Sequence, residues 1–572
     1  MTNSKLLFSL LLAGSVGTAS AQSLKDARAA IETENYGKAK TILQQLVSKQ
    51  AKVGDNYFYL GQIYLVNDKA DSAAIMFNQG LAADPKSLIN NVGLGYIDLL
   101  KKDKAAAESK FSAANANLKK KDYEELLEIG RAYIKAPEPD YAKALDYLTQ
   151  AKAKNTKDAA IPLALGDAYR GLKEASSAYT SYSDAIELDP NSNRAKIGLA
   201  TIVRGAQAFD EAVAQLTAIT TESPDYAPTY RELAETYNMW SKAPGTSEEK
   251  YVELNKKGVE QYKKYLEVNG DNSLEAKIRY ADFLVYARQY DELGAVSEEL
   301  ALNPDVDPKI YRYLAYNAFR NKEYSKASEN LEKMFAKMDT LRVIPLDNMY
   351  AGLSDVANNK VESGIVFIQK AIDQDKELLA EVAETAFAKY QDQETATAVS
   401  LFEIIAKYPD TDYYFDSNYY AGEGNYLVGF KKDQESKDEE GNVINQALRD
   451  EALANFIKAQ EYLSVIEKAV KPEVLDKYLV PALYYKAFSS LTADNLVEPK
   501  GDFVAPFEKL IVTINERGTQ EKNKAYLVDA NTYIGFYHYF KNDVAKAKAS
   551  FQEVLKLDPE NESAITYLDA LK

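Results

Sequence analysis

The chain has 572 residues, of which 46% are hydrophobic and 27% are charged, and its formal net charge is -17. This length exceeds one ordinary hydrophobic core unless the chain repeats, and the composition is that of a folded soluble protein rather than a disordered one. The negative charge disfavours bulk attraction to nucleic acid or to an anionic membrane, because both need clustered Lys and Arg, although a local basic patch can still exist.

The first residues have the three features of a secretory signal peptide. Lys5 supplies the positive charge, residues 6–17 form a short apolar run, and Ala19–Ala21 is a small-residue cleavage motif. We therefore expect a signal peptide at residues 1–21 and a mature protein that begins at Gln22. The alternative is a buried N-terminal helix.

This N-terminus predicts a bacterial protein exported to the periplasm, with secretion or the cell surface as alternatives. The chain has no Cys, which excludes both disulfides and the lipid-anchored Cys of a lipoprotein. No later stretch reaches about 18 uninterrupted apolar residues, so we expect no transmembrane helix.

A pattern of large and small residues begins in residues 59–85, YLGQIYLVNDKADSAAIMFNQGLAADP. Within it, Phe77 follows Gly61 by sixteen residues, and a Pro closes the stretch. The counterpart of Gly61 in the next copy is Gly95, which lies 34 residues further along the chain. Later copies are centred on the dipeptides Leu165-Gly166, Leu199-Ala200 and Ile534-Gly535.

Each copy predicts two helices joined by a tight turn. Large and small residues recur three or four apart, which places them on one helix face. The first half ends in turn-forming residues, as in VNDKAD, and the second half ends at an Asp-Pro pair, where Pro stops the helix. One such pair cannot bury its apolar side alone, but a stack of pairs can.

This pattern resembles that of the tetratricopeptide repeat family, whose 34-residue units carry an aromatic residue, Leu-Gly, Tyr, Ala, Phe, Ala and Pro. The copies at 54–87 and 159–192 match almost every position. The resemblance implies an all-α, right-handed superhelical solenoid of about fourteen stacked antiparallel helix pairs. Units at 273–306 and 307–341 match less well, the register at 345–410 is open, and the C-terminal segment SAITYLDAL resembles a capping helix.

Several units are longer than 34 residues because of inserts. These lie near 240–250, 431–449 and 492–506, and we expect them to form loops or helix extensions. They divide the chain into a first repeat array at 22–239, a central array at 240–430 and divergent C-terminal units at 431–572. The inserts are either parts of a binding face or tolerated surface loops.

Catalytic chemistry finds little support in the sequence. His538 is the only His, and it occupies a packing position of the last clear repeat. With no Cys and one His, zinc sites of His and Cys and Ser–His or Cys–His catalysis are close to excluded. We find no calcium loop, phosphate loop or dinucleotide motif, so we predict no enzyme activity, no metal and no cofactor. A carboxylate-dependent enzyme is kept as an alternative.

The remaining candidates are surface residues. By resemblance to the family, particular first-helix positions line a concave groove, and Arg and Tyr there are typical interface anchors. The candidate binding residues are Phe58, Gln62, Tyr96, Arg131, Arg170, Arg204, Arg231, Tyr316, Tyr419, Tyr484, Phe536 and Tyr539.

We accordingly predict a non-catalytic scaffold or adaptor that binds other proteins in the bacterial cell envelope, through a peptide segment or helix held in the groove. The alternative is an envelope-glycan-binding protein that uses a Tyr-rich groove. Nucleic acid is not an expected partner.

Overall fold

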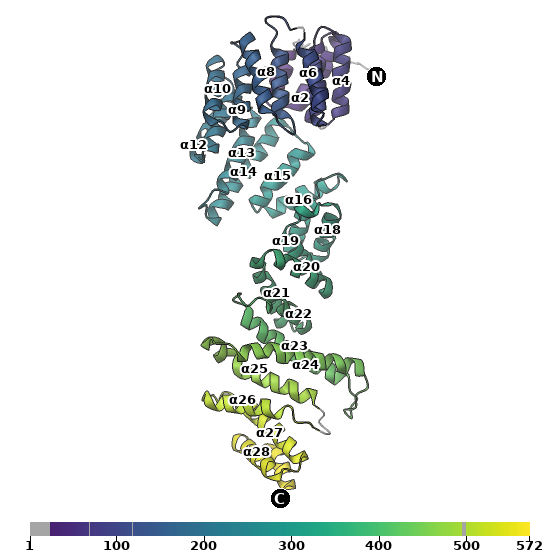
Figure 1. Ribbon diagram of the computed structural model, residues 1–572, viewed down its shortest axis with the longest axis vertical. Helices are drawn as coiled ribbons and strands as arrows, with labels where there is room; N and C mark the ends of the chain where they lie inside the picture. Colours follow the sequence, from purple (N-terminus) through teal and green to yellow (C-terminus); the bar gives the residue numbers. More distant parts are fainter. Residues whose placement is uncertain (1–22, 68, 117, 495–498) are drawn as a thin grey trace, which may run out of the picture. The chain divides into compact units, whose positions relative to one another are not determined.

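The computed structural model describes residues 23–67, 69–116, 118–494 and 499–572. In these ranges the backbone forms 29 α-helices and two short 3₁₀ helices, with one isolated bridge and no strand (Figure 1). The predicted all-α class is therefore confirmed, and the helix count matches about fourteen pairs followed by one terminal helix. The predicted signal peptide at 1–21 lies outside the described residues.

The helices up to residue 301 are, in chain order, α1 (Leu24–Glu32), α2 (Tyr36–Lys49), α3 (Gly54–Val66), α4 (Ala70–Ala83), α5 (Ile89–Leu100), α6 (Lys104–Asn115), α7 (Glu124–Lys135), α8 (Tyr141–Lys154), α9 (Ala160–Gly171), α10 (Ala175–Leu188), α11 (Asn193–Gly205), α12 (Phe209–Glu222), α13 (Ala227–Ser241), α14 (Glu248–Asn269), α15 (Leu274–Tyr286) and α16 (Tyr290–Ala301).

The remaining helices are α17 (Lys309–Arg320), α18 (Tyr324–Lys337), η1 (Thr340–Arg342), α19 (Pro345–Ala357), α20 (Val361–Gln374), η2 (Lys376–Leu378), α21 (Leu379–Gln391), α22 (Thr395–Ile405), α23 (Tyr414–Glu435), α24 (Gln446–Glu467), α25 (Pro472–Ala493), α26 (Val504–Glu516), α27 (Lys524–Phe540), α28 (Val544–Leu557) and α29 (Glu562–Ala570). None of these helices combines the length and the apolar character that crossing a bilayer requires.

Odd-numbered helices are the first helices of the pairs, and even-numbered helices are the second. Within the described residues, nine of the first helices are followed by a short turn with a left-handed non-Gly residue, such as Lys102 (φ 62°) or Lys173 (φ 62°). The second helices α4, α10 and α28 end directly before Asp84, Asp189 and Asp558, each of which precedes a Pro. The predicted turn and stop signals therefore act where the sequence places them.

Glycines in the first helices make room for one large side chain of the second helix. Phe77 of α4 is fully buried, and a Cβ built on Gly61 of α3 would lie 2.3 Å from its ring. A Cβ on Gly93 of α5 would lie 2.5 Å from the same ring, so Phe77 is held between two consecutive pairs. Tyr182 of α10 is held in the same way between Gly166 and Gly198. Each pair is thus stabilised by the next one along the chain.

The contacts divide the chain into two compact units, and the boundary falls inside α17. The N-terminal unit ends at Tyr313, and the C-terminal unit begins at Leu314. In the N-terminal unit, first helices contact the first helices of neighbouring pairs, from α3 with α5 through to α11 with α13. The three-part division at 239 and 430 stays a prediction.

The inserts mostly lengthen helices. The insert near 240–250 forms the end of α13, a turn with Gly245 in the left-handed region, and the start of the 22-residue helix α14. The insert at 431–449 extends α23 and α24, which are also 22 residues long and form one long hairpin (Figure 1). In the insert at 492–506, the Asp494 carboxylate accepts hydrogen bonds from the backbone N–H groups of Lys500 and Gly501.

Candidate functional site

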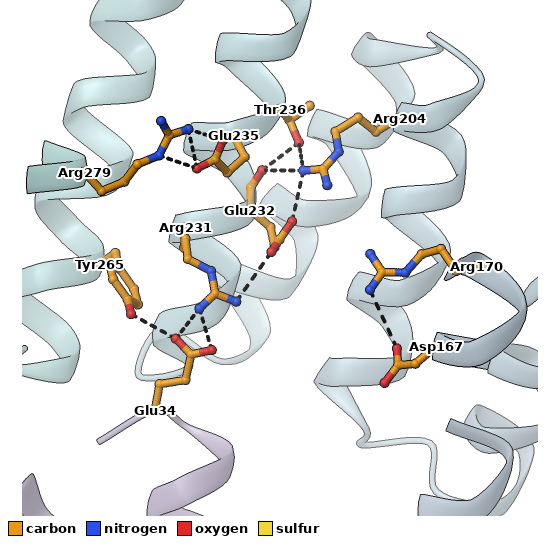
Figure 2. A network of polar contacts seen from close by, with 10 residues as sticks. All are labelled: Glu34, Asp167, Arg170, Arg204, Arg231, Glu232, Glu235, Thr236, Tyr265 and Arg279. Atoms are coloured by element: carbon orange, nitrogen blue, oxygen red, sulfur yellow. Dashed lines mark hydrogen bonds and ion pairs between the residues drawn. The ribbon is translucent and has the colours of Figure 1, made fainter. Parts of the chain in front are cut away.

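Four arginines predicted to line a groove lie on four consecutive first helices, α7, α9, α11 and α13, of the N-terminal unit. We call the surface formed by these helices together with α3, α5 and α15 the first-helix face. Each of the four arginines pairs with a carboxylate on this face or at its edge, and Figure 2 shows part of the resulting network.

On α7 and α9 the carboxylate precedes the arginine by three residues. Glu128 Oε1 lies 2.6 Å from Arg131 Nη1, and Glu128 Oε2 accepts a hydrogen bond of 3.2 Å from Gln62 Nε2 of α3. Asp167 Oδ1 lies 3.9 Å from Arg170 Nη2 (Figure 2). The same helix turn thus supplies the cation and a carboxylate that holds it in place.

Further along the face, ion pairs join neighbouring helix pairs. Arg204 of α11 lies 3.0 Å from the Glu232 carboxylate of α13 and also donates to the Thr236 hydroxyl (Figure 2). Arg279 of α15 donates two parallel hydrogen bonds, of 2.9 and 2.6 Å, to Glu235 of α13. The forked pair of Arg279 fixes geometry as well as charge. Through these two pairs, α13 holds α11 on one side and α15 on the other.

One contact on this face joins residues 197 positions apart. The Glu34 carboxylate, in the turn between α1 and α2, pairs with Arg231 of α13 and accepts a hydrogen bond of 3.0 Å from the Tyr265 hydroxyl of α14 (Figure 2). Burial alone would lower the pKa of Arg231, and the charge of Glu34 more than offsets this and raises it. The first helix pair is thereby tied to the seventh pair of the same unit.

Glu34→Ala is expected to loosen this tie. Arg231 keeps Glu232 as a partner, so we expect a loss of about 1–2 kcal/mol, since charged hydrogen bonds contribute about 1.5–3 kcal/mol and Arg231 is partly solvated. Amide exchange measured by mass spectrometry should become faster in α1 and α2. The control is Glu32→Ala, which removes an exposed carboxylate at the end of α1, two residues earlier. Equal exchange in the two variants would show that the Glu34 contact carries no stability.

The first helices α7, α9 and α11 together carry six Lys and Arg but four Asp and Glu. Asp167 also accepts hydrogen bonds from Tyr182 (2.7 Å) and from Arg194 of α11 (2.9 Å). Glu128 pairs with Arg131, and Asp167 pairs with both Arg170 and Arg194.

The Lys135 ammonium lies within the field of two of these cations. Desolvation by the surrounding protein, and then the charges of Arg194 and Arg131, lower its pKa. Part of the side chain still reaches solvent, and no ion pair or hydrogen bond of the ammonium is found within the described residues. Arg131 adds a buried Nε–H that has no hydrogen-bond partner there. This part of the face is therefore a surface with unused donors and positive charge.

Three other predicted residues of the N-terminal unit have structural roles. Phe58 is 1% exposed and packs against Phe77, with ring centroids 5.9 Å apart. The Tyr96 hydroxyl donates to the Lys135 backbone carbonyl at 3.2 Å and joins α5 to the end of α7. Gln62 reaches the first-helix face, as described above. Whether these residues take part in binding stays a prediction.

In the C-terminal unit the predicted residues are engaged by neighbouring side chains. Tyr316 donates to Asp347 at 2.8 Å. Tyr419 is 7% exposed and stacks on Tyr478, with centroids 4.5 Å apart.

Tyr484 donates to Asp529 at 2.8 Å and stacks on Tyr526. Phe536 and Tyr539 pack against Tyr567 of the terminal helix α29, which covers them. Their role in binding stays a prediction as well.

Sequence reasoning identified the arginines but missed Lys135 and Arg194. The spacing of Glu128 to Arg131 and of Asp167 to Arg170 was available in the sequence and indicates helical ion pairs. His538 has a side chain that is 12% exposed, and burial lowers its pKa, in keeping with a packing position. Among the described residues, no group of His, Asp and Glu could hold a metal ion.

Comparison with known proteins identifies the repeats in two places. Residues 24–87 and 163–227 match the family model described as the tetratricopeptide repeat. Over 113 residues, 20% of its length, the chain is 26% identical to tetratricopeptide repeat protein 1 of Schizosaccharomyces pombe, of which it spans 11%. These matches support the tetratricopeptide repeat family for the chain.

Solved structures give a similar picture. The C-terminal part of a repeat protein of this kind from Cytophaga hutchinsonii is 24% identical, with 51% of this chain and 99% of that chain covered and a TM-score of 0.26. A tetratricopeptide repeat protein from Parabacteroides merdae is 19% identical, with 45% and 96% covered and a TM-score of 0.29. At such TM-scores the likeness carries no argument about function.

Proposed function

We propose that this chain, two segments of which match the tetratricopeptide repeat, is a non-catalytic scaffold that holds other proteins in the bacterial cell envelope. Support comes from the stacked helix pairs, whose exposed faces suit a partner segment or helix, and from the signal-peptide pattern at 1–21. Cell fractionation with and without residues 1–21 tests export. A protein that stays in the cytoplasm with those residues present would contradict it.

The observation that carries the binding site is the excess of positive charge on the first helices α7, α9 and α11. We infer that this part of the first-helix face binds a segment of a partner that carries Asp or Glu. Lys135 offers an ammonium without an internal partner, and Arg170 is only loosely paired with Asp167, at 3.9 Å. A partner carboxylate would gain charge-assisted hydrogen bonds from both.

The tyrosines of the C-terminal unit do not single out a glycan site. Tyr419 is stacked on Tyr478, and Tyr484 is stacked on Tyr526 with centroids 4.0 Å apart, so one face of each ring is already covered. No observation in the described residues favours a glycan site, and we do not propose one.

The double variant Lys135→Ala/Arg170→Ala tests the proposed site. We expect it to bind a fluorescein-labelled oligoglutamate peptide about tenfold more weakly than the unaltered chain, because hydrogen bonds to charged groups contribute about 1.5–3 kcal/mol each. Fluorescence polarisation at fixed salt gives the affinities.

The matched control is Lys49→Ala/Lys52→Ala, which removes the same two positive charges from exposed positions at the end of α2 and in the loop that follows. It should bind within about twofold of the unaltered chain. If both double variants lose affinity equally, binding reflects total charge, and the proposed site is wrong.

A further inference from the structure

The C-terminal unit carries a second face with a different chemistry. Tyrosines of the first helices α21, α23 and α25 surround one carboxylate, that of Glu423 on α23. The Tyr390 hydroxyl donates to Glu423 Oε2 at 2.8 Å. Burial and then the charge of Glu423 raise the pKa of Tyr419 and of Tyr485, so both hydroxyls lie within the field of this carboxylate. Glu423 is half-buried, and the three phenols come from three consecutive first helices.

A second carboxylate extends this surface to α27. Asp529 accepts a hydrogen bond from Tyr484, and the Tyr484 ring stacks on Tyr526. Burial and then the charges of Glu423 and Asp529 raise the pKa of Tyr526, which shows that its hydroxyl lies within the field of both carboxylates. We call the surface formed by Tyr390, Tyr419, Glu423, Tyr484, Tyr485, Tyr526 and Asp529 the tyrosine face.

Among the described residues, no ion pair joins a Lys or Arg to Glu423 or Asp529, the two carboxylates of the tyrosine face. No Lys or Arg contributes to the raised pKa values of Tyr390, Tyr419, Tyr485 and Tyr526.

Other carboxylates of the same unit are paired. Asp416 has Lys477 at 3.3 Å, and Glu467 has Lys486 and Lys509. Burial also raises the pKa of Asp529, which shows that its negative charge is poorly solvated. The two carboxylates of the tyrosine face therefore form a partly buried negative surface whose counter-charge is not supplied by the described chain.

We propose that the tyrosine face binds Lys or Arg side chains of a partner protein segment. An ammonium or guanidinium group would donate to the carboxylates and lie against the tyrosine rings, and both interactions favour a cation at a partly desolvated site. The faces of tyrosine rings attract organic cations such as ammonium and guanidinium groups. The chemistry is opposite to that of the first-helix face and lies in the other unit, so the proposal goes beyond the binding site proposed there and does not depend on it.

The test compares two double variants that remove the same negative charge from the full chain. Glu423→Gln/Asp529→Asn changes the tyrosine face, and Glu516→Gln/Glu521→Gln changes two exposed carboxylates of the same unit. We expect binding of a fluorescein-labelled oligolysine peptide, measured by fluorescence polarisation, to weaken about tenfold in the first variant and less than about twofold in the second. Equal weakening in both would overturn the proposal.

A third variant separates the aromatic contribution from charge. Tyr526→Leu keeps both carboxylates and should weaken oligolysine binding about threefold through the lost cation–π contact. It also replaces the double variant if far-UV circular dichroism shows that the latter does not fold, and unchanged affinity would then overturn the proposal. Binding of tetramethylammonium without binding of the oligolysine peptide would indicate a site for a quaternary ammonium group, and would overturn it too.

Discussion

Replacing Phe77 with alanine is expected to lower the free energy of unfolding of the N-terminal helix pairs by about 3–5 kcal/mol, the usual cost of deleting a fully buried aromatic ring. The loss should be at the upper end of this range, because the ring fills space between two pairs. It packs between Gly61 of α3 and Gly93 of α5, which are positions without a Cβ that could fill the cavity. Urea denaturation followed by circular dichroism measures the effect.

The control for this prediction lies on the same helix. Ile75 is 54% exposed on α4, and Ile75→Ala should change the free energy of unfolding by less than about 0.5 kcal/mol. A comparable loss in both variants would mean that α4 is stabilised by general helix propensity rather than by insertion of Phe77 between neighbouring pairs.

The second large effect is expected at Asp433, whose side chain is 1% exposed at the base of the α23–α24 hairpin extension. It pairs with Arg449, which is 12% exposed, and lies 2.8 Å from the Lys437 ammonium. Asp433→Ala would leave the Arg449 charge buried without its carboxylate, and breaking a buried ion pair from one side costs about 3–5 kcal/mol. Arg449 also donates to the Thr492 carbonyl, so the loss should spread to the end of α25.

Hydrogen exchange measured by mass spectrometry should detect this loss as faster exchange in 431–449 and at the end of α25. Glu435→Ala is the matched control, because this carboxylate is 54% exposed and the one ion pair found for it among the described residues, 3.9 Å from Lys431, is at the surface. Similar exchange in the two variants would show that the extension is stabilised without the Asp433 pair.

Much of the fold could be predicted from spacing alone. The interval from Gly61 to Phe77 and the Asp-Pro ends of second helices predict contacts within one helix pair and between neighbouring pairs. Such contacts can be predicted because they join residues that are close in the sequence. At 345–410 these markers are weak, and the register could not be assigned. The structure places α19 to α22 there, and Gly352 contacts Ile368 of α20 in the same way as Gly61 contacts Phe77.

The contact of Glu34 with Arg231 could not be predicted in this way. It depends on small rotations between successive helix pairs that accumulate over 197 residues, and no single unit encodes them. The length of α14 could not be predicted from the sequence either, since an insert can form a loop or lengthen a helix at similar cost.

The candidate site could be predicted only in part. Position within the repeat identified Arg131, Arg170, Arg204 and Arg231, which the structure does bring onto one face. Position does not say whether a side chain is already paired, and all four are. Among the described residues, the Lys135 ammonium has no partner and the Glu423 carboxylate has no counter-ion, and this becomes apparent only when neighbouring first helices are placed together.

Amide exchange along the whole chain of the Phe77→Ala variant tests most directly the claim that each helix pair is stabilised by its neighbours. The account predicts faster exchange in α3 to α6, a smaller change in the pairs beside them, and unchanged exchange in α27 to α29. Faster exchange of similar size in every helix would contradict it, because the chain would then unfold as one cooperative core.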